Sequence, residues 1–184
     1  GIPVVAIASQ AFRENFYVKK VTVSEGVRTI GFMAFSDSSI EELYLPASLE
    51  VFSDIIFSPI HTVVIADGSK YYKTVDGVVY TADGETLVYY PQEKKDKEYT
   101  VLDGTKKIVT FSYNSHIERI NLPSSIKELQ SMNMLTNLHT MSLPEGLEII
   151  GQIIYNNLTE IIIPNTVKRL EGQNFSGCEM LKRV

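Results

Sequence analysis

Hydrophobic residues recur along this chain in one six-residue pattern, aliphatic-x-x-aliphatic-x-aliphatic, whose intervening positions are mostly polar. Alternation of apolar and polar residues with a period of two is typical of a short strand with one buried face. Complete copies of the pattern occupy residues 18–23, 40–45, 60–65, 117–122, 138–143 and 158–163. A further copy begins at Leu181. The pattern therefore predicts a series of similar short strands rather than one irregular globule.

The spacing of these copies is nearly constant. Their last aliphatic residues are Val23, Leu45, Ile65, Val101, Leu122, Leu143 and Ile163. Successive steps measure 20 to 22 residues, apart from a single step of 36 residues between Ile65 and Val101. Repeats of about 20 to 29 residues are characteristic of leucine-rich repeat solenoids. The period therefore predicts that the chain is a stack of coils, with one insertion.

Each predicted strand is followed by turn residues, such as Pro123-Ser124-Ser125 and Pro144-Glu145-Gly146, and then by a second pair of apolar residues. These pairs are Val27 with Ile30, Leu49 with Phe52, Ile126 with Leu129, Leu147 with Ile150, and Val167 with Leu170. A single coil buries too little apolar surface to stand alone, so neighbouring coils must share one core. We expect Leu122 and Leu143 to contribute to that core.

The sequence therefore predicts a right-handed leucine-rich repeat solenoid. Its expected elements are a curved parallel β-sheet of short strands, joined by loops and short helical turns. We assign residues 1–184 to this single domain, with about seven repeats that are incomplete at both ends. The chain begins and ends inside the repeat pattern, so we expect it to be part of a longer protein.

The long step predicts a β-hairpin insertion over residues 69–91. The β-prone runs 78–81 and 86–90 flank Asp83-Gly84, and Asp-Gly between two such runs is a strong hairpin signal. A charged run at residues 93–98 follows, and we interpret it as a solvated loop.

Composition excludes several classes of partner. The chain has 184 residues, 44% of them hydrophobic, and a formal charge of −5, which argues against a nucleic-acid-binding surface. One cysteine excludes an internal disulfide framework and a multi-cysteine zinc site. No apolar run approaches the length of a membrane helix, so we expect no membrane insertion of this segment.

One further pattern resembles a known family. Val27-Arg28-Thr29-Ile30-Gly31-Phe32-Met33-Ala34-Phe35, Ala11-Phe12 and Phe175-Ser176-Gly177-Cys178 are similar to the BspA-type, or Treponema pallidum-type, leucine-rich repeats of bacterial surface proteins. The form Tyr-x-x-x-Asp-Gly-Val-Val-Tyr in the insertion also resembles one that recurs in that family. The segments 130–134 and 152–155 lack the Ala-Phe pair, so we expect different packing there. The resemblance implies a non-enzymatic, cell-surface or secreted adhesion module that binds a host or matrix protein or a surface glycan.

Candidate chemistry is sparse. His61, His116 and His139 are scattered, and we interpret them as surface residues, while Cys178 reads as a small buried hydrophobe. Asp67 and Asp103 become neighbours if the insertion is excised, but Asp before Gly is the usual residue of such a turn. We therefore predict no catalytic residue, no metal and no cofactor. A carbohydrate-active β-helix enzyme is the weaker alternative, because such chemistry needs paired acids on adjacent rungs.

Two sets of residues are candidates for binding. The first comprises exposed positions on either side of each central strand aliphatic, namely Lys20, Thr22, Glu42, Tyr44, Thr62, Val64, Thr100, Arg119, Asn121, Thr140, Ser142, Glu160 and Ile162. The second set lies in the insertion and consists of Tyr71, Tyr72, Tyr80, Tyr89 and Tyr90. A structural reading of the tyrosines, as rings that pack on the coils, remains open. So does the reading of the whole chain as a structural spacer in a larger envelope protein.

Overall fold

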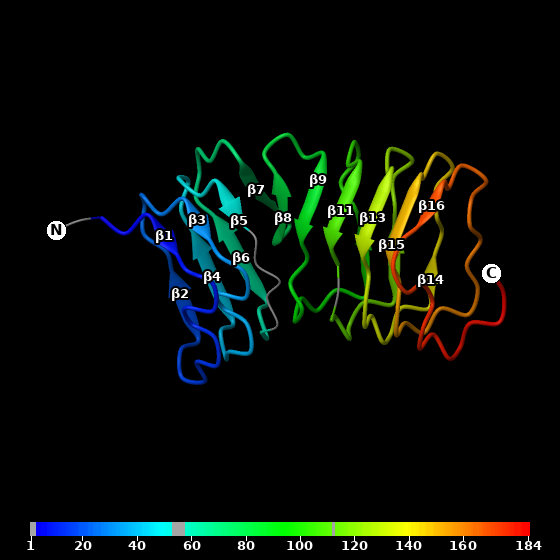
Figure 1. Ribbon diagram of the computed structural model, residues 1–184, viewed down its shortest axis with the longest axis horizontal. Coiled ribbons are helices and arrows are strands. Elements are labelled where there is room, and N and C mark those ends of the chain that lie inside the picture. The colour runs from blue at the N-terminus through cyan, green and yellow to red at the C-terminus, as the bar shows by residue number, and fades with distance from the viewer. Residues whose placement is uncertain (1–2, 53–57, 112) are drawn as a thin grey trace. The chain divides into compact units, whose positions relative to one another are not determined.

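The computed structural model describes residues 3–52, 58–111 and 113–184 (Figure 1). The chain divides into two compact units, Gly1–Asp83 and Gly84–Val184. Both units are built from coils that each contribute short strands to parallel ladders. The predicted leucine-rich repeat solenoid is therefore confirmed as the fold class.

The first unit contains two parallel ladders and a hairpin. One ladder has the order β2-β4-β6 and the other the order β1-β3-β5. The strands of this unit are β1 (Ala6–Ile7), β2 (Lys20–Thr22), β3 (Thr29–Ile30), β4 (Glu42–Leu45), β5 (Val51–Phe52), β6 (Thr62–Ile65), β7 (Tyr72–Val75) and β8 (Val78–Thr81). The predicted central strands are thus β2, β4 and β6.

The second unit repeats this arrangement. The central strands form the ladder β10-β12-β14, while β9, β11, β13, β15 and β16 stand side by side in a second one (Figure 1). The strands are β9 (Thr86–Tyr89), β10 (Glu98–Thr100), β11 (Lys107–Thr110), β12 (Arg119–Asn121), β13 (Glu128–Ser131), β14 (Thr140–Met141), β15 (Ile149–Gln152) and β16 (Arg169–Leu170). All of these pairings are parallel, as one strand per coil requires.

The core of each unit is a stack of aliphatic side chains. The central residue of each predicted strand is buried, for example Leu43, Val63, Ile120 and Met141. Leu122 and Leu143, at the ends of their patterns, are only half-buried, so our assignment of these two to the centre of the core was too strong. They sit where the chain turns toward proline, and the turn opens them to solvent.

The second ladder departs from the prediction of loops and short helical turns. The second apolar pair of each coil lies in or beside a strand, and the described residues form no helix. Leu129 shows why, because it is aligned with Ile108 on one side and Ile150 on the other. Backbone groups that pair with two neighbouring coils have no reason to form local helical bonds.

Close approach of two coils explains one glycine in this ladder. A Cβ on Gly151 would lie 2.2 Å from the carbonyl oxygen of Gln130, well inside van der Waals contact. Any side chain at position 151 would therefore separate β13 from β15 or distort one of them.

The insertion contains a hairpin, although a different turn closes it. Strands β7 and β8 pair in an antiparallel manner around Asp76 and Gly77, which both have positive φ angles, 49° and 74°. This conformation suits the right-handed twist of a two-residue hairpin. Strand β9, in contrast, is a coil strand paired in parallel with β11. The division between the units falls at Asp83–Gly84, and the pairing of 78–81 with 86–90 stays a prediction.

Buried asparagines join neighbouring coils at one corner of the second unit. Asn114 donates from Nδ2 to the carbonyl oxygens of Pro91 and Lys94, while its Oδ1 accepts from the backbone N–H groups of His116 and Ile117. Asn156 donates to the Met132 carbonyl and accepts from the Leu135 N–H in the same way. Each side chain thus satisfies backbone groups that the coil turns away from any strand.

Candidate binding surface

The predicted exposed columns exist, and their register is the predicted one. In the second unit Glu98 aligns with Arg119 and Thr140, and Thr100 aligns with Asn121. Glu160 bridges to Arg183 on the last coil. In the first unit Lys20 aligns with Glu42 and Thr62, and Thr22 aligns with Tyr44 and Val64.

Polar contacts in the second unit run between rungs of the central ladder. The Asn121 carboxamide donates to Glu98 Oε1 at 2.8 Å and to Thr100 Oγ1 at 3.1 Å. Arg183 and Glu160 are 3.3 Å apart. No ion pair to Arg119 exists within the part of the chain that the structure describes. Its exposed guanidinium therefore keeps its donors for water or for a bound group.

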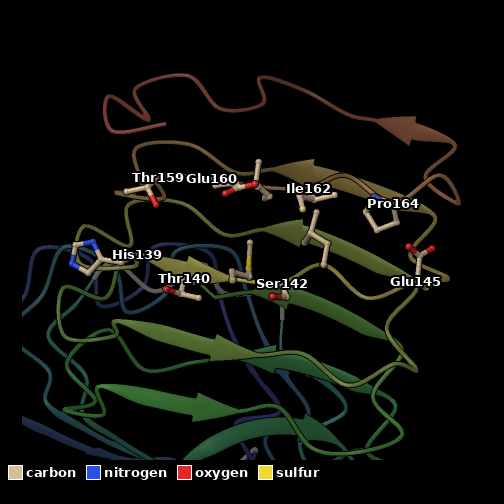
Figure 2. Close-up of a pocket in the computed structure, with 11 residues that line it drawn as sticks. His139, Thr140, Ser142, Glu145, Thr159, Glu160, Ile162 and Pro164 are labelled. Atoms are coloured by element: carbon tan, nitrogen blue, oxygen red, sulfur yellow. The ribbon is translucent and has the colours of Figure 1, made fainter. Parts of the chain in front are cut away.

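An open depression of about 480 Å³ lies on this face, over the last coils (Figure 2). Thr140, Ser142, Glu160 and Ile162 of the predicted columns line it. Figure 2 shows His139 and Thr159 at one end, Glu145 at the other, and Ile162 between them. Ile162 is 67% exposed, which is unusual for an isoleucine in a strand-like segment. The depression therefore combines one apolar centre with a polar rim.

A second depression of about 350 Å³ shares His139 and Thr140 with the first. Its other lining residues are Lys97, Glu98, Glu118 and Arg119. Lys97 and Glu118 pair at 3.0 Å, and this contact neutralises both of them. Arg119 and His139 are thus the groups of this depression best able to meet an acidic partner.

In the first unit the columns hold a compact cluster. Lys20 Nζ lies 3.3 Å from Glu42 Oε2 and 4.3 Å from the centre of the Tyr44 ring, while Tyr44 Oη donates to Glu42 Oε2 at 3.0 Å. The Tyr44 hydroxyl, together with Lys20, holds the pKa of Glu42 below its ordinary value, and the Glu42 hydrogen bond raises the pKa of Lys20. Thr22, Thr62 and Val64 surround the cluster with small exposed or half-buried groups.

This cluster gives a pH prediction. The ionised form of Glu42 is favoured, so its contacts are complete above its ordinary pKa and are lost as the pH falls through the lowered value. Tyr44→Phe removes the largest cause of the shift, so we expect the pKa of Glu42 to move upward. Carboxyl-carbon NMR titration would measure it. Glu148, whose pKa Lys168 lowers, is the internal control and should not change. An unchanged Glu42 titration would contradict the assigned hydrogen bond.

The hairpin candidates require a correction. Tyr80, Tyr89 and Tyr90 are buried, so these three do not form an exposed binding site. Tyr90 stacks on Phe111 with ring centres 4.0 Å apart, and its edge meets Tyr99. The reading of these rings as packing elements is the correct one for them. Tyr71 remains exposed, and Tyr72 is half-buried with its hydroxyl donating to the Glu50 carbonyl.

The remaining sequence candidates lie apart. His61 contacts Thr62, and His116 contacts Glu93 and Lys95. Cys178 is buried. Among residues 3–52, 58–111 and 113–184, no group of three or more His, Cys, Asp or Glu is arranged to hold a metal ion. No helix in the described ranges is long and apolar enough to cross a membrane.

Sequence reasoning missed part of the surface, namely the column that precedes the predicted ones. It contributes Lys97, Glu118, His139 and Thr159 to the depressions. The signal was present, because His61 and His139 occupy the same repeat position. We treated that position as background because no chemistry distinguished it from other exposed ones.

Comparison with known proteins gives a consistent result. A family model described as BspA type Leucine rich repeat region matches residues 2–74 and 97–184, in six copies. No curated protein matches the chain. Among solved structures, the pneumococcal vaccine antigen PcpA is similar, with 27% sequence identity and a TM-score of 0.78. That match covers 96% of this chain and 47% of the PcpA chain, so the present chain spans about half of that length.

Two more distant structures share the fold. A leucine-rich repeat protein from Eubacterium ventriosum has 17% identity and a TM-score of 0.57, with coverage of 100% of this chain and 70% of the other. A leucine rich cell surface protein from Faecalibacterium prausnitzii has 19% identity and a TM-score of 0.63, with coverage of 96% and 62%.

Proposed function

Because this chain belongs to the BspA-type leucine-rich repeat family, we propose that it is a non-enzymatic binding module that recognises a protein through the exposed face of the β10-β12-β14 ladder. We place it at the cell surface or outside the cell, on the analogy of the surface protein from Faecalibacterium prausnitzii. The partner is a host or matrix protein.

One observation carries the proposal: Ile162 lies exposed at the centre of a depression whose rim is polar. Protein interfaces place an apolar anchor at their centre and hydrogen-bonding groups around it. Thr140, Ser142 and Glu160 supply such groups from rungs that the parallel pairing holds rigid. A rigid rim binds with little loss of side-chain and backbone freedom.

Charge selects the partner further. Arg119 and His139 border the second depression and have no acidic partner among the described residues, so an acidic side chain of the bound protein would complete them. Neither exposed column places two carboxylates on adjacent rungs in the described coils, which supports recognition over glycoside hydrolysis.

The test is binding of the purified chain to arrays of extracellular matrix proteins, serum proteins and glycans, followed by variants against each hit. We expect Ile162→Asp and Arg119→Glu each to weaken binding by about tenfold or more, since a central anchor or charge pair contributes over 1 kcal/mol. Tyr44→Ala and Tyr72→Ala should bind as the parent does. Circular dichroism would establish that each variant is folded.

Three outcomes would contradict the proposal. Loss confined to Tyr72→Ala would move the site to the hairpin. Equal binding by all variants would move it away from the ladder face. A folded chain that binds no array member would favour the structural spacer.

A further inference from the structure

One corner of the second unit carries a row of exposed apolar side chains. Tyr113, Met134, Tyr155 and Phe175 occupy the same position of successive coils, and each has a left-handed backbone with φ between 54° and 63°. Hydrogen bonds join the coils there, from Tyr113 N to Asn133 O, Met134 N to Ile154 O, and Tyr155 N to Ser176 O. We call these four residues the corner row.

The side chains of the corner row face solvent. Tyr113, Met134 and Tyr155 are 37%, 38% and 48% exposed, and Phe175 is half-buried. Left-handed geometry costs energy for residues with a Cβ, so a row of large side chains at such positions is not what conformational preference alone would select. The row is separate from the depressions on the central ladder.

Tyr155 is held as a flat platform. A Cβ on Gly177 would lie 2.2 Å from Tyr155 Cδ1, 2.4 Å from Cε1 and 3.0 Å from Cγ. These three distances, with the fixed shape of a phenol ring, place that Cβ above the ring plane and close to the Cδ1–Cε1 edge. The ring thus lies with one face on the Gly177 backbone, and its exposed fraction belongs mainly to the opposite face.

The surroundings of the corner row are polar and uncharged. Residues 113–115, 133–137, 154–157 and 174–177 include no Asp, Glu, Lys, Arg or His, in a chain where 21% of residues are charged. Ser115, Thr136, Asn137 and Ser176 are exposed hydroxyl and carboxamide groups within these stretches. Such groups both donate and accept hydrogen bonds.

We propose that the corner row is a second binding site, which takes a linear neutral glycan along the stack of coils. The axial C–H groups of a sugar ring are weakly positive and apolar, and they pack against the negative face of an aromatic ring. Neighbouring sugar hydroxyls then exchange hydrogen bonds with the serine, threonine and asparagine groups. An acidic glycan would find no cation here, and a lipid surface would bury these polar groups without partners.

The test uses unlabelled hexasaccharides of β-glucan, α-mannan and N-acetylglucosamine against the chain with 13C-labelled methionine methyl groups. We expect the Met134 methyl resonance to shift on titration with at least one of them, while the Met33 resonance in the first unit stays fixed. Tyr155→Ala should weaken the affinity by about tenfold, the order of one aromatic contact. Tyr155→Phe, which keeps the ring, should bind as the parent does.

Two further variants separate this site from the ladder face. Gly177→Ala should weaken glycan binding although the tyrosine is present, because the added methyl group lifts the ring. Arg119→Glu should leave glycan binding unchanged. The proposal fails if no neutral hexasaccharide shifts Met134 at millimolar concentration, if Tyr155→Ala binds as tightly as Tyr155→Phe, or if a polysulfated glycan shifts Met134 and neutral ones do not.

Discussion

Leu129→Ala is expected to destabilise the second unit by about 2 to 5 kcal/mol, because it opens a cavity between coils that the backbone pairing prevents from closing. Leu129 is 1% exposed and lies on β13, aligned with Ile108 of β11 and Ile150 of β15. Each coil is half of its neighbour's core, so the lost contacts belong to three coils. Chemical denaturation followed by circular dichroism would measure the change in unfolding midpoint.

Gln130→Ala is the matched control for this change. Gln130 follows Leu129 in the same strand, but its side chain points to the opposite, exposed face. We expect its effect to stay within about 0.5 kcal/mol, as for most surface substitutions. Similar effects of the two variants would mean that the inward and outward positions of β13 are exchanged, and the whole register would shift by one residue.

The register of the central strands was predictable because it rests on hydrophobic alternation. Ile120 and Met141 are buried, and their neighbours Arg119 and Thr140 are exposed, as the period of two requires. The second ladder was not predictable in the same way. Its strand β16 has only two residues and two aliphatics, a pattern that fits a helical turn equally well. Pairing with the coils on either side decides between the two, and that information is non-local.

The candidate site was predictable in its residues but not in its shape. Thr140, Ser142, Glu160 and Ile162 follow directly from the register. That Glu145 and Pro164 close the depression at one end depends on how far each turn protrudes, which the repeat does not encode. Tyr80, Tyr89 and Tyr90 failed as candidates because their clustering in the sequence indicates either an interface or a core. Only burial separates these two readings.

Asn114→Ala is expected to destabilise the second unit by about 2 to 4 kcal/mol, because it leaves several buried backbone groups without a partner. Asn114 is fully buried. Its Nδ2 lies 2.9 Å from the Lys94 carbonyl oxygen and 3.2 Å from that of Pro91, and its Oδ1 lies 2.8 Å from the His116 nitrogen and 3.0 Å from the Ile117 nitrogen. Alanine can replace none of these bonds, and its smaller volume adds a void.

Amide hydrogen exchange distinguishes this cause from a general loss of packing. With the Oδ1 acceptor removed, the Ile117 N–H should exchange faster than the Ile126 N–H, whose bond to the Pro123 carbonyl is independent of Asn114. Asn137→Ala is the control, because Asn137 also donates to the coil before it, at the Ser115 carbonyl, but from an exposed position. Its cost should stay below about 1 kcal/mol, since water replaces the lost partner. Equal costs for the two asparagines would show that burial does not set the value of this bridge, and uniform exchange at Ile117 and Ile126 would assign the loss to packing.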